Sequence, residues 1–241
     1  MCIMQITERQ KLILGKIVDE FVDTAEPISS QRLEEKYDFS ICPATIRIEM
    51  QKLTDGGFLQ QPHTSAGRIP TDKAYRLFVN DILEENINEF DKRFLQEIRE
   101  IENEFMESMQ FAQILTKKLA DFTSNLALSY LNEEEVVLKE GWSEIVREPE
   151  FIDSDSLIRF TEMIEGWEHN IIDFNFPAKI QVFIGRENPL PKSQGFSVIV
   201  SKLRLPKEKK GIVAIFGPKR MDYNRNISAI NSLAKLLEAY D

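Results

Sequence analysis

Apolar side chains recur every three or four positions near the start of the chain, which is the periodicity of a helix with one buried face. Residues 7–24 carry this pattern, and Thr7 and Gln10 stand at the spacing of a capping box. Pro27 interrupts the pattern. Residues 29–37 are predicted to form a short second helix that begins at a serine cap.

A third helix is expected to begin at Pro43, because the first position of a helix needs no backbone N–H. Its inward face follows the helical spacing and comprises Ile46, Met50 and Leu53. Gly56 and Gly57 end it, residues 58–61 are strand-like, and residues 62–70 are interpreted as a loop between two short strands. Three helices followed by a hairpin is the element order of a winged helix-turn-helix.

A long helical connector is predicted over residues 81–131, because residues 88–130 contain neither proline nor glycine. An apolar stripe runs along it at a spacing wider than the 3.5-residue repeat of a left-handed coiled coil, which favours a bundle or a shorter helix–helix contact. The stripe comprises Phe90, Phe94, Ile98, Ile101, Phe105 and Met109.

The rest of the chain, residues 132–241, alternates strand and helix patterns. Strands are predicted at residues 136–138, 180–184, 196–201 and 211–216, and helices at about 155–167 and after Asp222. This order is typical of a small α+β domain. The predicted fold class is therefore α+β, with a winged helix-turn-helix over residues 1–80, the helical connector, and this C-terminal domain.

Cysteine and histidine are scarce, which excludes several kinds of chemistry. Two cysteines cannot make a disulfide scaffold, and they suit a reducing, cytoplasmic setting. His63 and His169 stand far apart without ligand spacing, so no metal site is expected. There is no apolar run long enough to cross a membrane and no secretory leader pattern. No cofactor motif or catalytic constellation is recognisable, and we do not expect an enzyme.

Charge is distributed unevenly, so the net charge of −10 does not exclude a nucleic-acid partner. Counting Lys and Arg against Asp and Glu gives −1 for residues 1–80, −15 for residues 81–170 and +6 for residues 171–241. A binding face needs only local positive charge. The third helix offers such a face, where Arg47 can pair with guanine, Gln51 with adenine, and Ala44 or Thr45 with a thymine methyl or phosphate.

The loop at residues 62–70 is a second candidate for DNA contact. Arg68, expected at the hairpin tip, can enter a minor groove or hold phosphate, and the side chains beside it that can donate to phosphate are His63, Thr64 and Ser65. Both sites have ordinary alternatives: a solvated helix face and a turn shaped by Gly and Pro. A winged helix can also dock on protein.

Two further features have simple explanations. Cys42 precedes the third helix, where the helix dipole can lower a thiol pKa, but a small buried or cap-adjacent residue is the simpler interpretation. Residues 217–220 have the sequence Gly-Pro-Lys-Arg and lie between a predicted strand and a helix. Such a turn can bind an anion at the helix N-terminus, although a plain β–α turn is the simpler interpretation.

Several segments together resemble the bacterial heat-inducible transcription repressors of the HrcA type. The resemblance is continuous over residues 1–80 and is carried there by residues 7–14, 26–30, 43–50 and 61–73. Beyond residue 139 it is patchy but ordered, and is carried by residues 139–142, 148–151, 184–189 and 217–223. The long segment 61–73 is the most specific of these.

The resemblance implies a cytoplasmic homodimeric repressor of chaperone genes that binds an inverted-repeat DNA operator, called CIRCE. It also implies a GAF-like effector domain with an inserted dimerising domain, and dependence on the cytosolic chaperonin. The matching positions assign Pro43, Ala44, Thr45 and Arg47 to the recognition helix, and His63, Thr64, Ser65 and Arg68 to the wing. A protein-interaction module and a GAF-like ligand-sensing regulator are the alternatives.

Three departures from the family pattern stand out. Cys42 replaces the usual serine, and Ile48 replaces the usual asparagine, which indicates either a contact with a thymine methyl or a changed operator. Residues 126–128 run almost directly into residues 132–135, so much of the first half of the GAF-like domain and the inserted domain are expected to be missing. A dimer contact through the apolar stripe is the resulting hypothesis, with candidate residues Phe90, Phe94, Ile98, Ile101 and Phe105.

Overall fold

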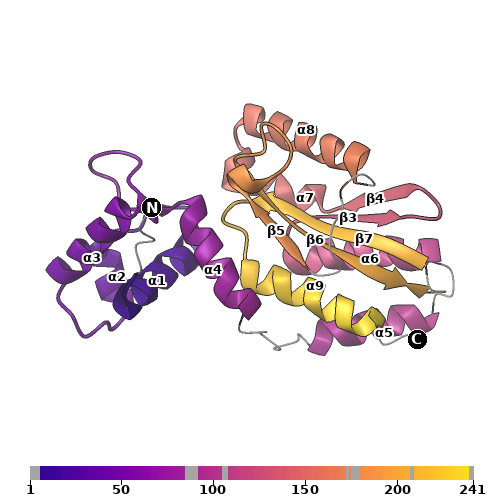
Figure 1. Ribbon diagram of the computed structural model, residues 1–241, viewed down its shortest axis with the longest axis horizontal. Helices are drawn as coiled ribbons and strands as arrows, with labels where there is room; N and C mark the ends of the chain where they lie inside the picture. Colours follow the sequence, from indigo (N-terminus) through magenta and orange to yellow (C-terminus); the bar gives the residue numbers. More distant parts are fainter. Residues whose placement is uncertain are drawn as a thin grey trace. The chain divides into compact units, whose positions relative to one another are not determined.

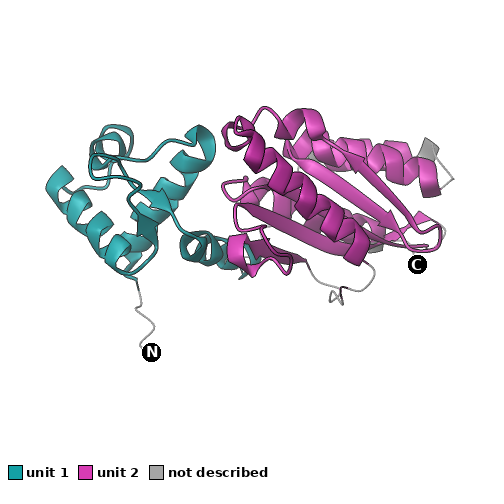
Figure 2. Cartoon of the chain, turned by 90° about the horizontal axis from the view of Figure 1, so that it is seen from above, with its two compact units in different colours: residues 1–84 teal, residues 85–241 magenta. Residues whose placement is uncertain are grey.

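The computed structural model divides the chain into two compact units, residues 1–84 and residues 85–241 (Figure 2). It describes residues 6–84, 92–104, 108–171, 174, 180–206 and 209–238. Each unit has its own apolar core. Among the helices of the described ranges, none is both long and apolar enough to cross a membrane.

Unit 1 consists of three helices, a two-stranded antiparallel hairpin and a fourth helix (Figure 1). The elements are α1 (Glu8–Thr24), α2 (Ser30–Lys36), α3 (Pro43–Asp55), β1 (Leu59–Gln60), β2 (Ile69–Pro70) and α4 (Asp72–Glu84). The predicted capping box is present, since Thr7 N–H donates to Gln10 Oε1 at 3.0 Å and Gln10 N–H donates to Thr7 Oγ1 at 3.3 Å. Ser29 caps α2.

A buried carboxylate ties α2 to α1. Glu20 of α1 is only 1% exposed, and it accepts hydrogen bonds from Arg32 Nε at 3.1 Å, from Tyr37 Oη at 2.6 Å and from Lys36. Burial acts to raise the pKa of Glu20, but the bonds from Lys36, Tyr37 and Arg32 outweigh it and lower that pKa. Burial and the Glu20 charge raise the pKa of Tyr37 to about 12.

Unit 2 is built on a five-stranded antiparallel sheet in the order β4-β3-β7-β6-β5. Its helical segments are α5 (Lys92–Glu104), α6 (Ser108–Thr123), α7 (Trp142–Ile145), the 3-10 turns η1 (Pro149–Phe151) and η2 (Gly185–Glu187), α8 (Ser154–Asn170) and α9 (Tyr223–Glu238). Its strands are β3 (Leu126–Leu131), β4 (Val136–Glu140), β5 (Gln181–Ile184), β6 (Phe196–Leu205) and β7 (Lys209–Pro218). The chain thus combines helices with an antiparallel sheet, which agrees with the mixture of helices and strands in the predicted α+β class.

Helices cover both faces of this sheet, with α8 on one side and α6 and α9 on the other (Figure 1). On the α8 side, Phe160 and Trp167 pack among aromatic and aliphatic side chains of the strands, including Phe196 and Phe216. The core of unit 2 therefore lies in two layers, one on each face of the sheet.

The prediction of a helical connector over residues 81–131 is wrong at its C-terminal end. Residues 126–131 form β3, which pairs with β4 on one side and β7 on the other, and all six of its residues are buried. A short, mostly apolar run of this length fits a buried strand as well as a helix, so periodicity alone could not separate them. The helices α5 and α6 belong to unit 2 rather than to a separate connector.

The apolar stripe proposed for dimerisation also needs correction. Phe94, Ile98 and Ile101 are buried within unit 2, where α5 packs against α6 and α9. The ring centroid of Phe94 lies 4.5 Å from that of Phe122. These side chains fill the chain's own core and are not available to a second copy. Phe90 and Phe105 lie outside the described residues.

Candidate nucleic-acid interface

The outward side of α3 gathers the side chains that were predicted to contact bases. Ile46, Met50 and Leu53 turn into the core as predicted, and so does Glu49. Thr45 is half-buried. The exposed set, which we call the α3 face, comprises Pro43, Ala44, Arg47, Ile48 and Gln51. Ile48 is 55% exposed, and the Arg47 side chain forms no hydrogen bond or ion pair with the described residues.

Glu49 holds α3 against α1, a contact that the sequence pattern did not indicate. Its Oε2 accepts a hydrogen bond from Gln10 Nε2 at 2.8 Å, and its Oε1 pairs with Lys52 Nζ at 3.1 Å. Burial acts to raise the pKa of Glu49, but the bonds from Gln10 and Lys52 lower it overall. Gln10 therefore both caps α1 and anchors α3. The contact with α1 fixes the buried side of α3, so that the α3 face lies towards solvent.

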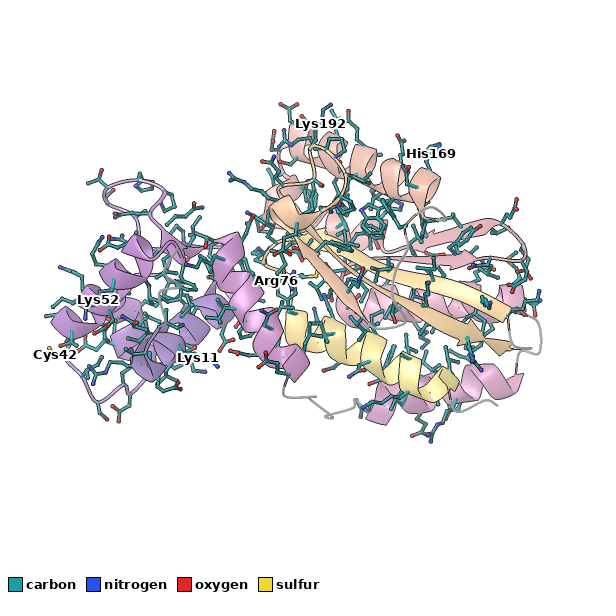
Figure 3. All side chains as sticks on the ribbon, in the orientation of Figure 1. Lys11, Cys42, Lys52, Arg76, His169 and Lys192 are labelled. Atoms are coloured by element: carbon teal, nitrogen blue, oxygen red, sulfur yellow. The ribbon has the colours of Figure 1, made fainter. Side chains whose placement is uncertain are left out.

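The N-terminus of α3 begins as predicted, with Pro43 in the first turn after Cys42. Cys42 is exposed and its side chain makes no capping hydrogen bond to the helix backbone. Its Sγ lies 3.3 Å from Thr45 Oγ1, and this hydrogen bond lowers the pKa of the thiol. Figure 3 labels Cys42 beside α3 and Lys52 farther along the helix.

The hairpin between β1 and β2 ends in an exposed loop that projects from the helices of unit 1 (Figure 1). Gln61 Nε2 closes this loop by donating to the carbonyl oxygens of Thr64 and Ala66, both at 2.9 Å. His63 Nδ1 lies 3.2 Å from Ser65 Oγ. The residues predicted for phosphate contact, His63, Thr64 and Ser65, are therefore all exposed at the tip.

Arg68 is not at the hairpin tip, contrary to expectation. Its backbone pairs with Ile28, with N–H to O distances of 2.8 and 2.9 Å, so residue 68 lies at the base of the hairpin. Its side chain is half-buried and turned towards α3, where Nε donates to Thr54 Oγ1 and Nη2 donates to Gln51 Oε1, both at 3.1 Å.

Gly67 allows this close approach of the hairpin to the segment before α2. A Cβ atom at residue 67 would lie 2.4 Å from both the carbonyl carbon and the carbonyl oxygen of Ile28. Real Cβ atoms essentially never come so near another heavy atom, so only glycine fits without a backbone shift. The glycine that suggested an ordinary turn thus has a specific packing role.

Unit 2 brings together two of the C-terminal segments that carry the family resemblance, residues 148–151 and 217–223. Arg220, in the turn after β7, is nearly buried and forms ion pairs with Glu148 and with both carboxylate oxygens of Glu150, at 2.7 and 3.1 Å. Burial acts to lower the pKa of Arg220, but Glu150 and Glu148 raise it overall. Because two carboxylates already neutralise this guanidinium, the structure favours the plain β–α turn over an anion site.

Metal chemistry gains no support from the structure. Among the residues it describes, there is no group of three or more His, Cys, Asp or Glu side chains that could hold a metal ion. His63 belongs to unit 1, whereas His169 lies near the end of α8 in unit 2, where its Nδ1 faces Glu165 O at 2.6 Å (Figure 3).

Two relatives of this chain carry the same name. A protein from Thermodesulfovibrio yellowstonii, named heat-inducible transcription repressor HrcA, is 25% identical over 339 positions that cover 96% of this chain and 97% of that protein. A relative of the same name from Desulfitobacterium hafniense is 49% identical over 83 residues, which cover 34% of this chain and 24% of that protein.

The longer of these alignments also bears on the length of the chain. It spans 339 positions, whereas this chain has 241 residues, so about a hundred positions of the relative have no counterpart here. This agrees with the expected shortening. A crystal structure of a hypothetical protein matches with a TM-score of 0.75 and 21% identity, covering 98% of this chain and 97% of that one, which supports the fold alone.

A family model described as the HrcA protein C terminal domain matches residues 65–227. This match covers more than half of the chain and spans most of unit 2 together with the end of unit 1. It includes the segments 139–142, 148–151, 184–189 and 217–223 on which the C-terminal resemblance depended. The chain therefore belongs to the HrcA family.

Proposed function

We propose that this chain is a DNA-binding transcriptional repressor of heat-shock and chaperone genes. In this proposal residues 1–80 act as a winged helix-turn-helix, with α3 as its recognition helix. The observation that carries it is the α3 face, where the exposed Arg47, which has no acidic partner in the described part of the chain, stands beside exposed aliphatic and amide side chains. The names of the relatives support the same function.

The α3 face supplies the chemical groups that read a major groove. Arg47 carries the fork of donors that suits guanine O6 and N7, and Gln51 carries the amide that suits adenine N6 and N7. Ala44 and Ile48 offer apolar surface for a thymine methyl. Pro43 and Thr45 lie in the first turn, where the helix N-terminus favours a phosphate.

The exposed hairpin tip is proposed to contact the DNA backbone. His63, Thr64 and Ser65 carry donors that suit phosphate oxygens, and such contacts set register rather than sequence preference. Because Gln61 closes the loop through two carbonyl oxygens, the loop backbone that carries these donors is ordered before DNA binds. This arrangement reduces the conformational entropy that binding would otherwise cost.

Unit 2 is proposed to act as a shortened GAF-like effector domain in a cytoplasmic homodimer. An inverted-repeat operator requires two copies related by a two-fold axis, one on each half-site. The relatives' names point to heat-inducible control, and the resemblance described from the sequence adds the cytosolic chaperonin as the proposed partner. The chain is not proposed to catalyse a reaction.

The test measures fluorescence anisotropy of the full chain on a labelled CIRCE-type inverted repeat and on a scrambled duplex at the same salt. We expect clear preference for the repeat. Arg47→Ala should weaken binding to the repeat by about 1–3 kcal/mol, since a bidentate contact to guanine would be lost. Arg159→Ala, which removes one exposed positive charge from unit 2, is the matched control and should bind as wild type does.

Equal, weak binding of the wild-type chain to both duplexes would contradict the proposal. That outcome would favour the alternative in which unit 1 docks on a protein. A small molecule that raised the melting temperature of unit 2 would instead favour ligand sensing.

A further inference from the structure

The main chain of Arg68 is fixed at both of its hydrogen-bonding groups. Its N–H donates to Ile28 O at 2.8 Å, and its carbonyl accepts from Ile28 N–H at 2.9 Å. Gly67 beside it allows a backbone approach that no other residue would tolerate. The Cα of Arg68 therefore has a set position, and its side chain projects from a rigid base.

The guanidinium spans two side chains of α3. Nε donates to Thr54 Oγ1 and Nη2 donates to Gln51 Oε1, both at 3.1 Å. Thr54 donates its own hydroxyl proton to Met50 O at 2.8 Å, so its oxygen is oriented to accept. Two donors of one planar group thus meet two acceptors one turn apart on the helix, a geometry that lysine cannot reproduce.

Arg68 and Asp55, on opposite sides of the Gln51 amide, both favour the same orientation of that amide. A guanidinium has only donors, so the amide atom that faces it must be the oxygen. The nitrogen is then directed to the other side, where Nε2 donates to Asp55 Oδ1 at 2.8 Å. The amide oxygen keeps one lone pair and the nitrogen keeps one hydrogen, which are the acceptor and the donor that adenine N6 and N7 require.

We propose that Arg68 is a positioning residue for DNA readout, which holds the Gln51 amide on the α3 face in the orientation that selects adenine. In this role its guanidinium stays on Thr54 and Gln51 and does not bind phosphate. The inference rests on the proposed function of the α3 face. It replaces the direct contact with a minor groove or a phosphate that the sequence suggested for this arginine.

The first experiment uses the inverted-repeat duplex that the full wild-type chain prefers, with each base pair changed in turn. At the base pair that Gln51 contacts, we expect the preference for adenine to be about tenfold weaker than wild type in Arg68→Lys and in Gln51→Ala. The double variant should lose no more than either single variant, because both changes remove the same contact. The slope of affinity against salt should stay at the wild-type value in Arg68→Lys.

A phosphate contact gives a different pattern. Arg68→Lys, which keeps the charge, would then retain base preference, and Arg68→Ala would weaken every duplex alike and reduce the salt slope by about 1. That result would overturn the inference while leaving the proposed function in place. A wild-type chain without any base preference would instead overturn the proposed function.

A measurement without DNA tests the geometry separately. The side-chain NH₂ resonances of Gln51 in ¹⁵N-labelled full chain should shift in Arg68→Lys and in Thr54→Val, which removes the acceptor for Nε at nearly constant volume. Unshifted Gln51 resonances in both variants would overturn the inference whatever the DNA results. Thermal unfolding of both variants checks that unit 1 remains folded.

Discussion

Gly67 is a residue at which one added methyl group should have a large effect. In Gly67→Ala the new Cβ would lie 2.4 Å from the Ile28 carbonyl carbon and oxygen, so the paired backbones of Ile28 and Arg68 must separate. We expect a loss of about 1–3 kcal/mol in the stability of unit 1, since two backbone hydrogen bonds and their packing are disturbed. Thermal unfolding of the full chain measures it.

Gly15 provides the matched control for that substitution. It lies inside α1, and a Cβ added there would meet no atom within 4 Å. Gly15→Ala should therefore stabilise unit 1 by up to about 1 kcal/mol through helix propensity. If Gly67→Ala left the melting temperature at or above the wild-type value, the close approach at Ile28 would not be the reason for glycine.

Arg68 and Gln10 make contacts that could not be predicted from the sequence. The sequence suggested that Arg68 contacts DNA because it follows a glycine in a presented loop. Its contacts to Thr54 and Gln51 depend on how the hairpin folds back on α3, which no local pattern encodes. The capping role of Gln10 is a local effect and could be predicted, whereas its bond to Glu49 joins positions 39 residues apart and could not.

The packing of α2 on α1 depends on the charge of Glu20. Its pKa is lowered from the ordinary value of 4.5, so the unfolded chain binds the proton more readily than the folded one. The stability that this carboxylate contributes is therefore fully present above pH 4.5 and is lost as the pH falls through the lower folded pKa. The cause is its set of bonds from Arg32, Lys36 and Tyr37.

Glu20→Gln should accordingly destabilise unit 1 at pH 7 by about 2 kcal/mol, since hydrogen bonds from charged donors lose their charged acceptor. The difference from wild type should shrink as the pH is lowered below 4.5, where the wild-type carboxylate becomes protonated as well. Thermal unfolding across this pH range measures it. Glu26→Gln, at a glutamate that is 72% exposed and also pairs with Arg32, is the matched control. A constant gap at all pH values would contradict this account.

Elements were predictable where one face of a helix is buried and the other exposed. The limits of α1, α2 and α3 follow from caps, Pro43 and the apolar spacing, and all three form close to their expected positions. The strand β3 was missed because its six residues are buried on both faces and leave no alternation. The helix α5 was predicted. The sequence pattern could not show, however, whether its apolar side packs against this chain or against a second copy.

At the scale of the whole molecule, the two units have separate cores, and about a hundred positions of a longer relative are missing. The DNA binding proposed for unit 1 rests on its exposed α3 face. The dimer proposed for an inverted repeat must therefore use surfaces other than Phe94, Ile98 and Ile101, which the core of unit 2 already occupies.

The proposed dimer can be tested by the length of the DNA. If two copies bind together, the full inverted repeat should bind at least about tenfold more tightly than a duplex carrying one half-site, because the second unit 1 binds at high effective concentration. Anisotropy titrations on both duplexes measure this, and sedimentation velocity gives the mass of the complex. If both duplexes bound with equal affinity per half-site and each half-site held one chain, the dimer proposal would be contradicted. This shortened member of the family would then bind its operator as independent monomers.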